Sequence, residues 1–515
     1  MLLAEVVDTS EAVAATRSRL AKRAAIAGCL RRGAAGADEL EIAVAYLAGA
    51  PRQRRTGLGW AALRDLPPPA TSATLTLHDV DAALAALSRI AGTGSEAARA
   101  AATSALFGAA TEREQQFLRA LILGELRQGA LDSVVVDAVA EAADVPADAV
   151  RRAVMLRGAT GPVASAALLS PDPLATLAGF SLEVGRPVRP MLAQSAPDVG
   201  AALDKLPGDG ACVDVKLDGI RIQVHRADDD VRVFTRSLDD ITRRVPEIVA
   251  AVRALPEVRL VLDGEAMVLG PDGAPRPFQE TASRSATELD AVTLTPFFFD
   301  VLHAGGRDLI DAPLRERLAV LDRVAGPHTV RRLMRPGRAA DAETATLFTE
   351  FFDEAIREGQ EGVVVKSLDS PYAAGRRGAG WIKVKPRKTL DLVVLAVEWG
   401  SGRRQGKLSN IHLGARRPGP DGDDFVMLGK TFKGMTDKML EWQTERFLEL
   451  ETSREGHVVH VCPEQVVEIA FDGLQRSTRY PGGLALRFAR VLRYRDDKTA
   501  AEADTIDAVR SLASA

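Results

Sequence analysis

Lysine is scarce in this chain of 515 residues. Only 12 of its 66 Lys and Arg residues are lysines, and none lies between Lys22 and Lys205. Because arginine supplies most of the positive charge, we expect some of the remaining lysines to lie at positions where a guanidinium that never loses its proton will not serve. One of them, Lys216, stands between two β-like runs in "DVKLDGIRIQVHR" (214–226).

Cysteines and long apolar runs are scarce too. The three cysteines lie far apart and form no Cys-x-x-Cys pair, which indicates a reducing compartment and argues against a structural zinc site. No stretch approaches the roughly 18 apolar residues of a membrane span. The N-terminal residues lack the basic flank and apolar stretch of a signal peptide. We therefore expect a cytoplasmic protein, nucleoid-associated if bacterial, with no membrane partner.

The chain carries no excess of positive charge. Its net charge is −4 and its pI is about 6.1. A protein with this balance is not a general polyanion binder, so a surface for nucleic acid must come from local Arg and Lys patches.

The composition of the sequence and the spacing of its apolar residues change twice along the chain. Residues 1–182 are rich in Ala and Leu with apolar side chains three and four apart, and Thr111 is a candidate N-cap, so we predict an all-helical domain. Residues 187–386 mix short β-rich runs with helical stretches and predict an α+β domain. The stretch 184–197 at its start, with Pro187 and Pro190 three residues apart, is typical of an extended linker.

The third segment covers residues 389–515. About five strand-like runs surround one predicted helix at 437–450, which fits a small barrel of the OB type, although a sandwich fits as well. The predicted architecture is therefore multi-domain.

Five of the scarce lysines are candidate phosphate ligands or nucleophiles. Lys216 lies in a Lys-x-Asp-Gly pattern, whose structural alternative is a hairpin closed by Asp-Gly. Lys383 and Lys385 in "WIKVKP" are two apart, so on a strand both project from one face and attract an anion such as a triphosphate. The other two are Lys366 and Lys498.

Carboxylates and aromatic residues accompany these lysines. The acids are hard oxygen ligands and favour a magnesium–nucleotide site; they are Asp218, Asp263, Glu265, Glu361 and Asp497. In the run Phe297–Phe299, alternation along a strand leaves at least one ring free to stack on a base, unless all three lie in the core.

Two basic patches occur in the helical segment, "PRQRR" (51–55) and "GELRQGALD" (124–132). Either they are solvated helix ends, or their arginines contact nucleic-acid phosphates. The residues concerned are Arg52, Arg54, Arg55 and Arg127.

The ordered motifs from Lys216 onward resemble the nucleotidyltransferase motifs of ATP-dependent DNA ligases. They are "KLDGIR" (216–221), "TRS" (235–237), "LDGEAMV" (262–268), "FFFDVL" (297–302), "EGVVVK" (361–366), "WIKVKP" (381–386) and "RYRDDK" (493–498). The helical patches and "RPVRPMLAQ" (186–194) resemble the DNA-binding domain and the junction of larger cellular ligases. The resemblance implies a helical DNA-binding domain, an ATP-grasp-like ligase domain and a C-terminal OB barrel.

Residue roles follow from the same resemblance. It implies that Lys216 becomes adenylylated and that Phe299 stacks on adenine. Arg221 and Arg236 would contact the nucleotide ribose and the 5′-phosphate of the nick. Glu265 would bind the ribose or the metal, and Glu361 would help to hold the divalent metal. Phosphate contacts are implied for Lys383 and Lys385, and pyrophosphate orientation for Arg495, Asp497 and Lys498. Lys366 and Asp214 complete the implied nucleotide site.

Asp214 departs from the family pattern. In many relatives the residue two before the nucleophile is a glutamate that contacts the adenine amine. Aspartate is shorter by one methylene, so the contact with the base differs here.

The resemblance also implies the cofactors and the partner. ATP and Mg²⁺ would be used, and the substrate would be nicked double-stranded DNA, encircled by a monomer whose barrel moves about a hinge near 387–390. The sequence identifies no sliding-clamp or repair-protein partner. Alternatives are an RNA ligase, a capping-type guanylyltransferase or a non-catalytic nick-binding protein. An NAD-dependent ligase would carry a four-cysteine zinc module, which three cysteines cannot form.

Overall fold

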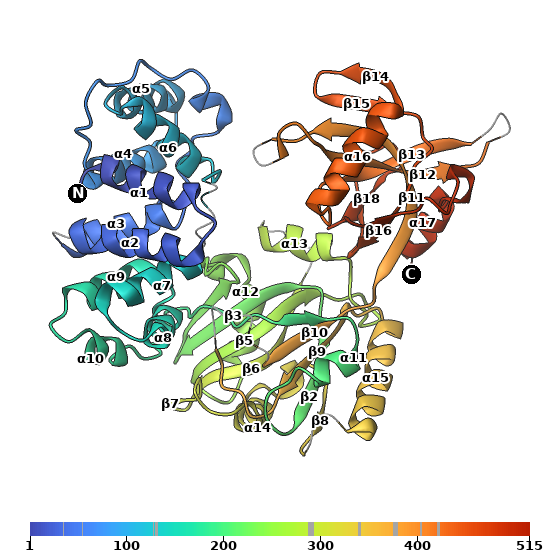
Figure 1. Ribbon diagram of the computed structural model, residues 1–515. Helices are drawn as coiled ribbons and strands as arrows, with labels where there is room; N and C mark the ends of the chain where they lie inside the picture. The colour runs from blue at the N-terminus through green and yellow to red at the C-terminus, as the bar shows by residue number, and fades with distance from the viewer. Residues whose placement is uncertain are drawn as a thin grey trace. The chain divides into compact units, whose positions relative to one another are not determined.

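The computed structural model describes residues 1–514 apart from ten gaps. The gaps are 34–35, 54, 127, 129–131, 287–292, 338–340, 374–377, 379, 402–403 and 420–422. Two compact units account for the chain. The first comprises Met1–Ser195, Leu203–Thr346 and Val364–Lys383, and the second comprises Ala196–Ala202, Leu347–Val363 and Val384–Ala515. Figure 1 gives the course of the chain.

The N-terminal segment is helical, as the spacing of its apolar residues predicts. Its elements are α1 (Leu3–Ala15), α2 (Arg19–Gly33), α3 (Ala37–Leu47), η1 (Trp60–Leu63), α4 (Leu77–Arg89), α5 (Ser95–Gly108), α6 (Glu112–Ile122), α7 (Asp132–Ala143), α8 (Ala147–Arg157), α9 (Thr160–Leu169) and α10 (Pro173–Ala178). Thr111 caps α6 in a capping box with Glu114, which confirms the predicted helix start. Buried side chains from Leu3 to Leu177 form one hydrophobic cluster.

The middle segment contains two sheets. One has the order β1 (Gln194–Ala196), β10 (Trp381–Val384), β9 (Gly362–Ser367), β2 (Ala211–Lys216) and β8 (Arg332–Arg335). The other has the order β4 (Asp230–Thr235), β3 (Ile220–Ala227), β5 (Arg259–Val268), β6 (Leu294–Ala304) and β7 (Arg307–Asp308). The helical elements are α11 (Val199–Leu203), η2 (Thr242–Arg244), α12 (Pro246–Arg253), α13 (Phe278–Ala286), α14 (Leu314–Ala325), η3 (Gly326–His328) and α15 (Ala342–Arg357).

The hairpin interpretation of Asp218-Gly219 is wrong. Strands β2 and β3 belong to different sheets: β2 pairs with β8 and β9, and β3 pairs with β4 and β5. The chain therefore passes from one sheet to the other directly after Lys216. Residues 211–215 of β2 are all buried, since the strand lies inside its sheet.

The C-terminal segment is a β domain with its own hydrophobic cluster, from Leu390 to Val509. Its elements are β11 (Lys388–Trp399), β12 (Leu408–Arg417), β13 (Asp424–Thr431), α16 (Asp437–Glu449), β14 (Glu451–Glu455), β15 (Val458–Val461), β16 (Val466–Phe471), β17 (Gly473–Arg476), β18 (Leu484–Arg487), β19 (Arg490–Tyr494), η5 (Ala500–Glu502) and α17 (Ile506–Ser514). The predicted helix at 437–450 is confirmed as α16.

One long strand organises this domain. The first half of β11 pairs with β16, its second half pairs with β15, and β12 runs along its other edge. A strand shared in this way bends the sheet around the cluster, as in a small barrel of the OB type. Among the described residues, no helix is long and apolar enough to cross a membrane.

His225 on β3 is a buried, neutral histidine and predicts an acid dependence of stability. Burial, followed by the charges of Arg232 and His303, lowers its pKa to about 3. The unfolded chain takes up this proton near pH 6.5, so between about pH 6.5 and 3 the unfolded state binds more protons and stability falls as the pH drops. At pH 5 the loss relative to pH 7 amounts to about 2 kcal/mol from this group.

We expect the melting temperature to fall less between pH 7 and pH 5 in His225→Asn than in the unmodified protein. Differential scanning calorimetry at several pH values measures this difference. Equal falls in the two proteins would contradict a buried, neutral His225.

Candidate functional site

Lys216 ends β2, and the geometry around it depends on a glycine. Its ammonium group is half-buried and lies 3.4 Å from the carbonyl oxygen of Leu217. Three residues later, a Cβ atom on Gly219 would lie 2.4 Å from the carbonyl oxygen of Ala266 on β5. Only glycine therefore lets the segment after Lys216 approach β5 so closely.

Substitution of this glycine gives the first test of the site. We expect Gly219→Ala to force the backbone away from β5, to destabilise the fold by about 1–3 kcal/mol, and to displace Lys216. The rate at which ATP adenylylates Lys216, the reaction implied by the family resemblance, should fall more than tenfold. It is measured on protein that circular dichroism shows to be folded. Gly59→Ala is the control, because Gly59 has an ordinary φ of −110° and open space around its Cβ position. An unchanged rate in Gly219→Ala would contradict this role.

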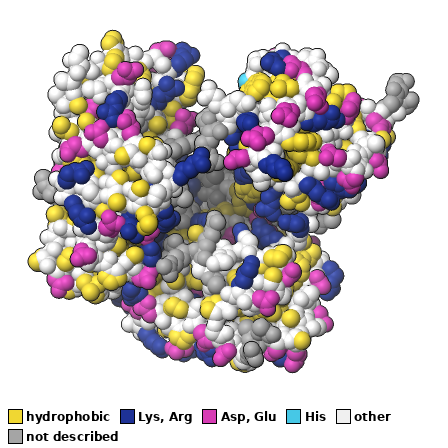
Figure 2. Space-filling model, viewed as in Figure 1, with side chains coloured by type: hydrophobic (Ala, Val, Ile, Leu, Met, Phe, Trp, Pro, Cys, Tyr) yellow, Lys and Arg dark blue, Asp and Glu magenta, His cyan; other side chains and the backbone are white. Residues whose placement is uncertain are grey.

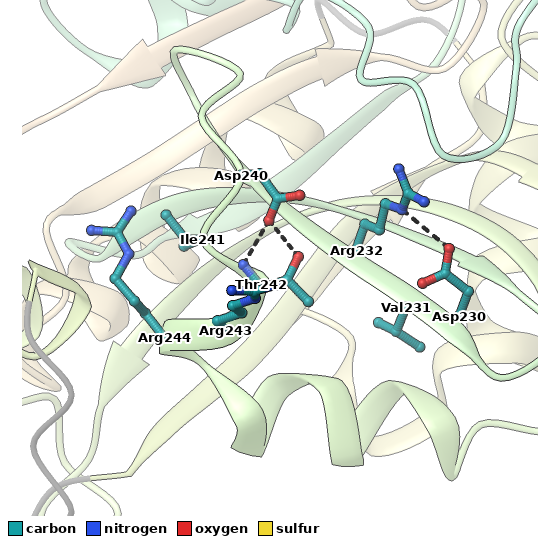
Figure 3. A pocket seen from close by; sticks show the side chains of 8 residues that line it. All are labelled: Asp230, Val231, Arg232, Asp240, Ile241, Thr242, Arg243 and Arg244. Atoms are coloured by element: carbon teal, nitrogen blue, oxygen red, sulfur yellow. Dashed lines mark hydrogen bonds and ion pairs between the residues drawn. The ribbon is translucent and has the colours of Figure 1, made fainter. Parts of the chain in front are cut away.

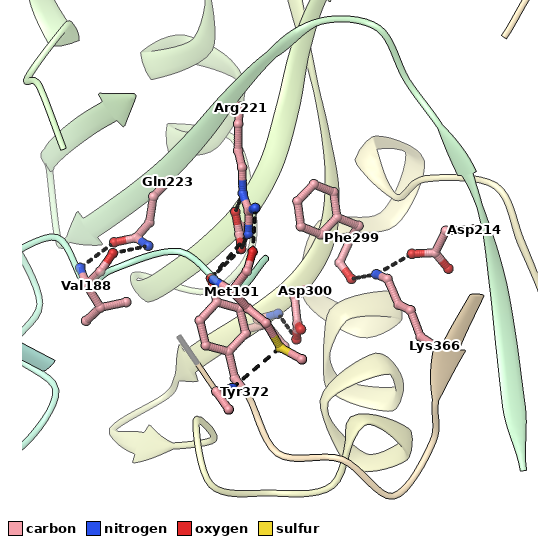
Figure 4. A network of polar contacts seen from close by, with 12 residues as sticks. Val188, Met191, Asp214, Arg221, Gln223, Phe299, Asp300, Lys366 and Tyr372 are labelled. Atoms are coloured by element: carbon pink, nitrogen blue, oxygen red, sulfur yellow. Dashed lines mark hydrogen bonds and ion pairs between the residues drawn. The ribbon is translucent and has the colours of Figure 1, made fainter. Parts of the chain in front are cut away.

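Asp214 and Lys366 form a buried ion pair beside Lys216. The Lys366 ammonium lies 2.5 Å from Asp214 Oδ2, and both side chains are 2% exposed. Lys366 also donates to the Phe299 carbonyl oxygen at 3.2 Å, and the Cys212 thiol donates to Asp214 Oδ1 at 3.2 Å. Figure 4 shows Lys366 between Asp214 and Phe299. Asp214 and Lys366 were both predicted as residues of the nucleotide site, but the sequence did not indicate that they pair with each other.

The run Phe297–Phe299 alternates as the strand predicts. Phe298 is completely buried, while Phe297 and Phe299 are half-buried on the other face of β6. Phe299 packs edge-on against Trp381, with ring centroids 5.7 Å apart. The Lys366 ammonium lies 4.8 Å and 4.5 Å from the Phe299 and Trp381 centroids. Phe299, Trp381 and Lys366 thus form one cluster of two rings and a cation. The sequence motifs predicted Phe299 and Lys366 as site residues but not Trp381.

Arg221 is held in place by a second buried network. Its Nε and Nη2 donate to the two oxygens of Asp263 at 3.0 and 2.6 Å, and Nη1 donates to the Met191 carbonyl oxygen at 2.6 Å. The Tyr372 hydroxyl donates to Asp263 at 2.6 Å. Burial disfavours the guanidinium, but the Asp263 carboxylate outweighs it and raises the pKa of Arg221.

This network fixes the orientation of Arg221 toward the aromatic pair. Its guanidinium carbon lies 5.4 Å from the Phe299 centroid and 5.7 Å from that of Trp381. Asp263 and Tyr372 are buried and do not depend on solvent for their partners. Sequence reasoning noted Asp263 only as a carboxylate and missed Tyr372, because its partner lies 109 residues away in sequence.

Glu265 lies on the same sheet as Arg221, and Arg236 follows one of its strands. Glu265 is half-buried on β5 and pairs in register with Arg221 on β3 and with Phe297 on β6. Residues directly opposite on neighbouring strands share a face, so Glu265 lies on the face of Arg221. Arg236 is exposed on the turn after β4.

The second unit contains two further predicted groups. Lys385 is ion-paired with Glu361, and its ammonium lies 3.5 Å from Asp472. Burial lowers the pKa of Lys385, but the Glu361 carboxylate outweighs this and raises it. Lys383, half-buried on β10, lies two residues before Lys385 and is the last residue of the first unit.

The motif at 493–498 gathers around one acid. Arg495 Nη1 and the Lys498 ammonium lie 3.0 and 2.7 Å from Asp391 Oδ2. Arg495 also forms a bidentate pair with Asp497 at 2.8 and 2.7 Å, which lowers the pKa of Asp497 to about 2. Asp391 lies on β11, and no sequence motif indicated it.

The predicted arginines of the helical segment divide into two kinds. The guanidinium of Arg52 contacts Asp81 at 3.1 and 2.5 Å and Asp38 at 2.5 Å, so it links helices α3 and α4. Arg55 is exposed. Arg54 and Arg127 lie outside the described residues. Figure 2 shows Lys and Arg interspersed with Asp and Glu over the visible face, in keeping with the net charge of −4.

A pocket of about 550 Å³ lies elsewhere on the first unit, beside β4 and η2 (Figure 3). Its acids serve local structure. Asp240 accepts from the backbone and hydroxyl of Thr242 at 2.9 and 2.6 Å, and Asp230 pairs with Arg232 at 3.1 Å. None of the predicted site residues lines it.

No cluster of three or more His, Cys, Asp or Glu side chains suited to a metal ion occurs among the described residues. Magnesium is commonly held by one or two carboxylates together with substrate phosphates, and it keeps several waters. The half-buried Glu265 and the carboxylate of Glu361 fit that mode of binding, in which the protein supplies no complete cage.

Comparison with known proteins places this fold and site in a class. Three family models match: "DNA ligase N terminus" over residues 61–140, "ATP dependent DNA ligase domain" over 190–385 and "ATP dependent DNA ligase C terminal region" over 404–498. Their order follows that of the helical segment, the two-sheet segment and the C-terminal β domain. These matches define an ATP-dependent ligase.

Curated relatives extend the likeness over the whole chain. A probable DNA ligase of Beutenbergia cavernae is 72% identical over 522 residues, covering 100% of both chains, and one of a Nocardioides species is 62% identical over 99% of both. The solved structure named Pmar-Lig_PreS3 has a TM-score of 0.64 at 18% identity, covers 95% of this chain and 99% of its own, and shows a shared fold. The chain belongs to the family of ATP-dependent DNA ligases.

Proposed function

We propose that this ligase seals nicks between a 3′-hydroxyl and a 5′-phosphate in duplex DNA through AMP bound covalently to Lys216. The observation that carries the proposal is the place of Lys216 at the end of a buried strand, two residues after Asp214, whose buried partner Lys366 lies on the neighbouring strand β9 and faces the rings of Phe299 and Trp381. A lysine amine is a nucleophile only when it has lost its proton.

The proposed reaction has three steps. The Lys216 nitrogen attacks the α-phosphorus of ATP, the bond to the bridging oxygen breaks, pyrophosphate leaves, and the amine proton passes to solvent. A 5′-phosphate oxygen of the nick then attacks the same phosphorus, the P–N bond breaks, and the Lys216 nitrogen takes up a proton from solvent, which restores the amine. Last, the 3′-hydroxyl attacks the 5′-phosphate, loses its proton, and AMP departs.

The remaining residues bind and orient. We propose that Phe299 stacks on adenine and that Arg221 and Arg236 contact ribose and the 5′-phosphate. Lys383 and Lys385 would neutralise charge on the α-phosphate, which stabilises the transition state. Arg495, Asp497 and Lys498 would orient pyrophosphate. The roles of Phe299 and Arg221 are supported by their common sheet, and those of Arg495 and Lys498 by their shared partner Asp391.

Magnesium is proposed as the metal. Mg²⁺ bound to the triphosphate would add positive charge at the phosphorus under attack. Glu265 and Glu361 are the carboxylates that would hold it. Removal of Lys385 would leave Glu361 without its ion-pair partner, so Lys385 has two proposed tasks, phosphate binding and orientation of Glu361.

Duplex DNA is the proposed substrate of a monomeric enzyme. Because the chain is slightly acidic, binding must rest on local arginine and lysine contacts with phosphates, and affinity should fall steeply with salt. The exposed Arg55 is a proposed phosphate contact. Arg54 and Arg127 are proposed from sequence alone. For Arg52 we propose mainly the structural role given by Asp38 and Asp81.

A labelling experiment tests the proposed function. The protein is incubated with magnesium and ATP, GTP or NAD, each labelled in the nucleotide monophosphate that would be transferred, and the denatured chain is examined for label. We expect label from ATP alone, and its transfer to nicked duplex DNA but not to nicked RNA. Label from GTP or NAD, or no transfer to nicked DNA, would contradict the proposal.

A further inference from the structure

In the segment between the helical part and the two-sheet part, every backbone N–H group donates a hydrogen bond. The segment comprises residues Gly185 to Met191, "GRPVRPM", which the sequence suggested as a linker. Pro187 and Pro190 carry no N–H group. The remaining amides all have partners: Gly185, Arg186, Val188, Arg189 and Met191 donate to His225 Nδ1, Glu183 O, Gln223 Oε1, Met155 O and Tyr372 Oη at 2.8–3.0 Å. We call this segment the strap.

One edge of the strap is fixed by side chains of a single strand. Arg221, Gln223 and His225 alternate along β3, so they share a face. Arg221 donates to the Met191 carbonyl oxygen at 2.6 Å, and His225 accepts from the Gly185 amide at 3.0 Å. Figure 4 shows Arg221 and Gln223 directed toward Met191 and Val188.

Gln223 contributes most to this edge. Its amide accepts from the Val188 N–H at 2.8 Å and donates to the Val188 carbonyl at 3.1 Å, which reproduces the pairing of a neighbouring strand. Gln223 Oε1 also lies 2.9 Å from His225 Nε2. Because His225 Nδ1 accepts from Gly185, Nε2 carries the proton and donates to Gln223. Gln223 is 4% exposed and Val188 is completely buried.

The other edge is fixed to the helical part by Arg189. Its amide donates to Met155 O on α8 at 2.9 Å, and its guanidinium contacts Gly158 O at 3.1 Å, Thr160 Oγ1 at 3.0 Å and Asp132. These partners begin or end helices α7, α8 and α9. The strap is thus bonded on one side to β3, the strand that follows Lys216, and on the other to three helices.

We propose that Gln223 and Arg189 are positioning residues for the DNA-dependent steps, and that they act through the strap. This inference rests on the proposed function. The first step needs only ATP and the groups around Lys216, whereas the later steps need the helical part to present DNA to the adenylylated lysine. Reacting groups displaced by about 1 Å can lose a hundredfold in rate. Release of the strap therefore slows AMP transfer to DNA and spares lysine adenylation.

Three exchanges test this, each keeping side-chain volume while removing the polar contacts: Gln223→Met, Arg189→Met and both together. We expect adenylation of the protein by ATP to stay within about twofold, and single-turnover AMP transfer to nicked DNA to fall about tenfold or more in each single variant. The double variant should be no slower than the slower single one, because both contacts hold the same element.

Arg315→Met is the matched control. Arg315 forms an exposed pair with Asp369 in the same unit and does not contact the strap. We expect it to leave both steps unchanged. Gln223→Asn, which retains the amide but shortens its reach, replaces Gln223→Met if that variant does not fold.

Hydrogen exchange gives a readout that does not depend on activity. The amides of Val188 and Met191 should be protected in the unmodified protein, and Gln223→Met should speed exchange at Val188. Equal losses in adenylation and transfer, unchanged transfer, multiplied losses in the double variant, or an unprotected strap would each overturn the inference. Absence of lysyl-AMP in the unmodified protein would instead count against the proposed function.

Discussion

Lys216→Arg should abolish transfer of AMP from ATP to the protein. Arginine keeps the positive charge and nearly the same length, but it cannot be deprotonated and so cannot attack phosphorus. We expect no detectable labelled chain, a loss of at least about 10⁴-fold, comparable to removal of a catalytic nucleophile. The measurement is labelling with ATP followed by denaturing electrophoresis. Label on Lys216→Arg at the normal rate would place the nucleophile elsewhere.

The same variant separates the first step from the last. DNA that already carries AMP on its 5′-phosphate needs only attack by the 3′-hydroxyl. We expect Lys216→Arg to seal such DNA measurably, because this step does not use the amine as a nucleophile. Lys205→Arg is the control, since Lys205 is an exposed lysine that lies outside the motifs. Its labelling should match that of the unmodified protein.

Lys366→Met should cause the largest loss of stability near the site. It removes the ammonium that pairs with Asp214 and leaves a carboxylate buried without its counter-charge. Breaking a buried pair in this way costs about 3–5 kcal/mol. Lysine adenylation should also fall sharply, because Lys366 holds the Phe299 carbonyl and faces both aromatic rings. Thermal unfolding and ATP labelling measure the two effects.

A second exchange identifies the cause of that loss. In Lys366→Met combined with Asp214→Leu, no buried charge remains, and most of the stability should return. Lys388→Met is the control for loss of a lysine, since Lys388 is exposed at the start of β11. A double variant as unstable as Lys366→Met would contradict the importance of the pair.

Local sequence signals predicted local structure well. The capping box at Thr111 and Glu114 and the helix Asp437–Glu449 follow from interactions between residues three or four apart. The alternation in Phe297–Phe299 is equally local, because a strand directs successive side chains to opposite faces. The ordered lysine motifs predicted the family, which the comparisons confirm.

Partners distant in sequence were not predictable in the same way. Asp391 gathers Arg495 and Lys498 across more than 100 residues, and Tyr372 reaches Asp263 across 109. The Asp-Gly pattern predicted a hairpin, but β3 pairs with β5 rather than β2, and only that pairing explains why Gly219 must lie against Ala266. The two prolines of the strap predicted an extended linker, but its hydrogen bonds to side chains of β3 and the contacts of Arg189 with the helices could not be predicted from them.

The most direct test of the proposed mechanism is to find the residue that carries AMP. The protein is incubated with magnesium and ATP, digested under conditions that preserve a P–N bond, and its peptides are analysed by mass spectrometry. We expect AMP on Lys216 alone, removed when nicked DNA is added before digestion. AMP on Lys366, Lys383 or another residue would contradict covalent catalysis by Lys216. Nick sealing by a protein in which Lys216 never carries AMP would contradict it as well.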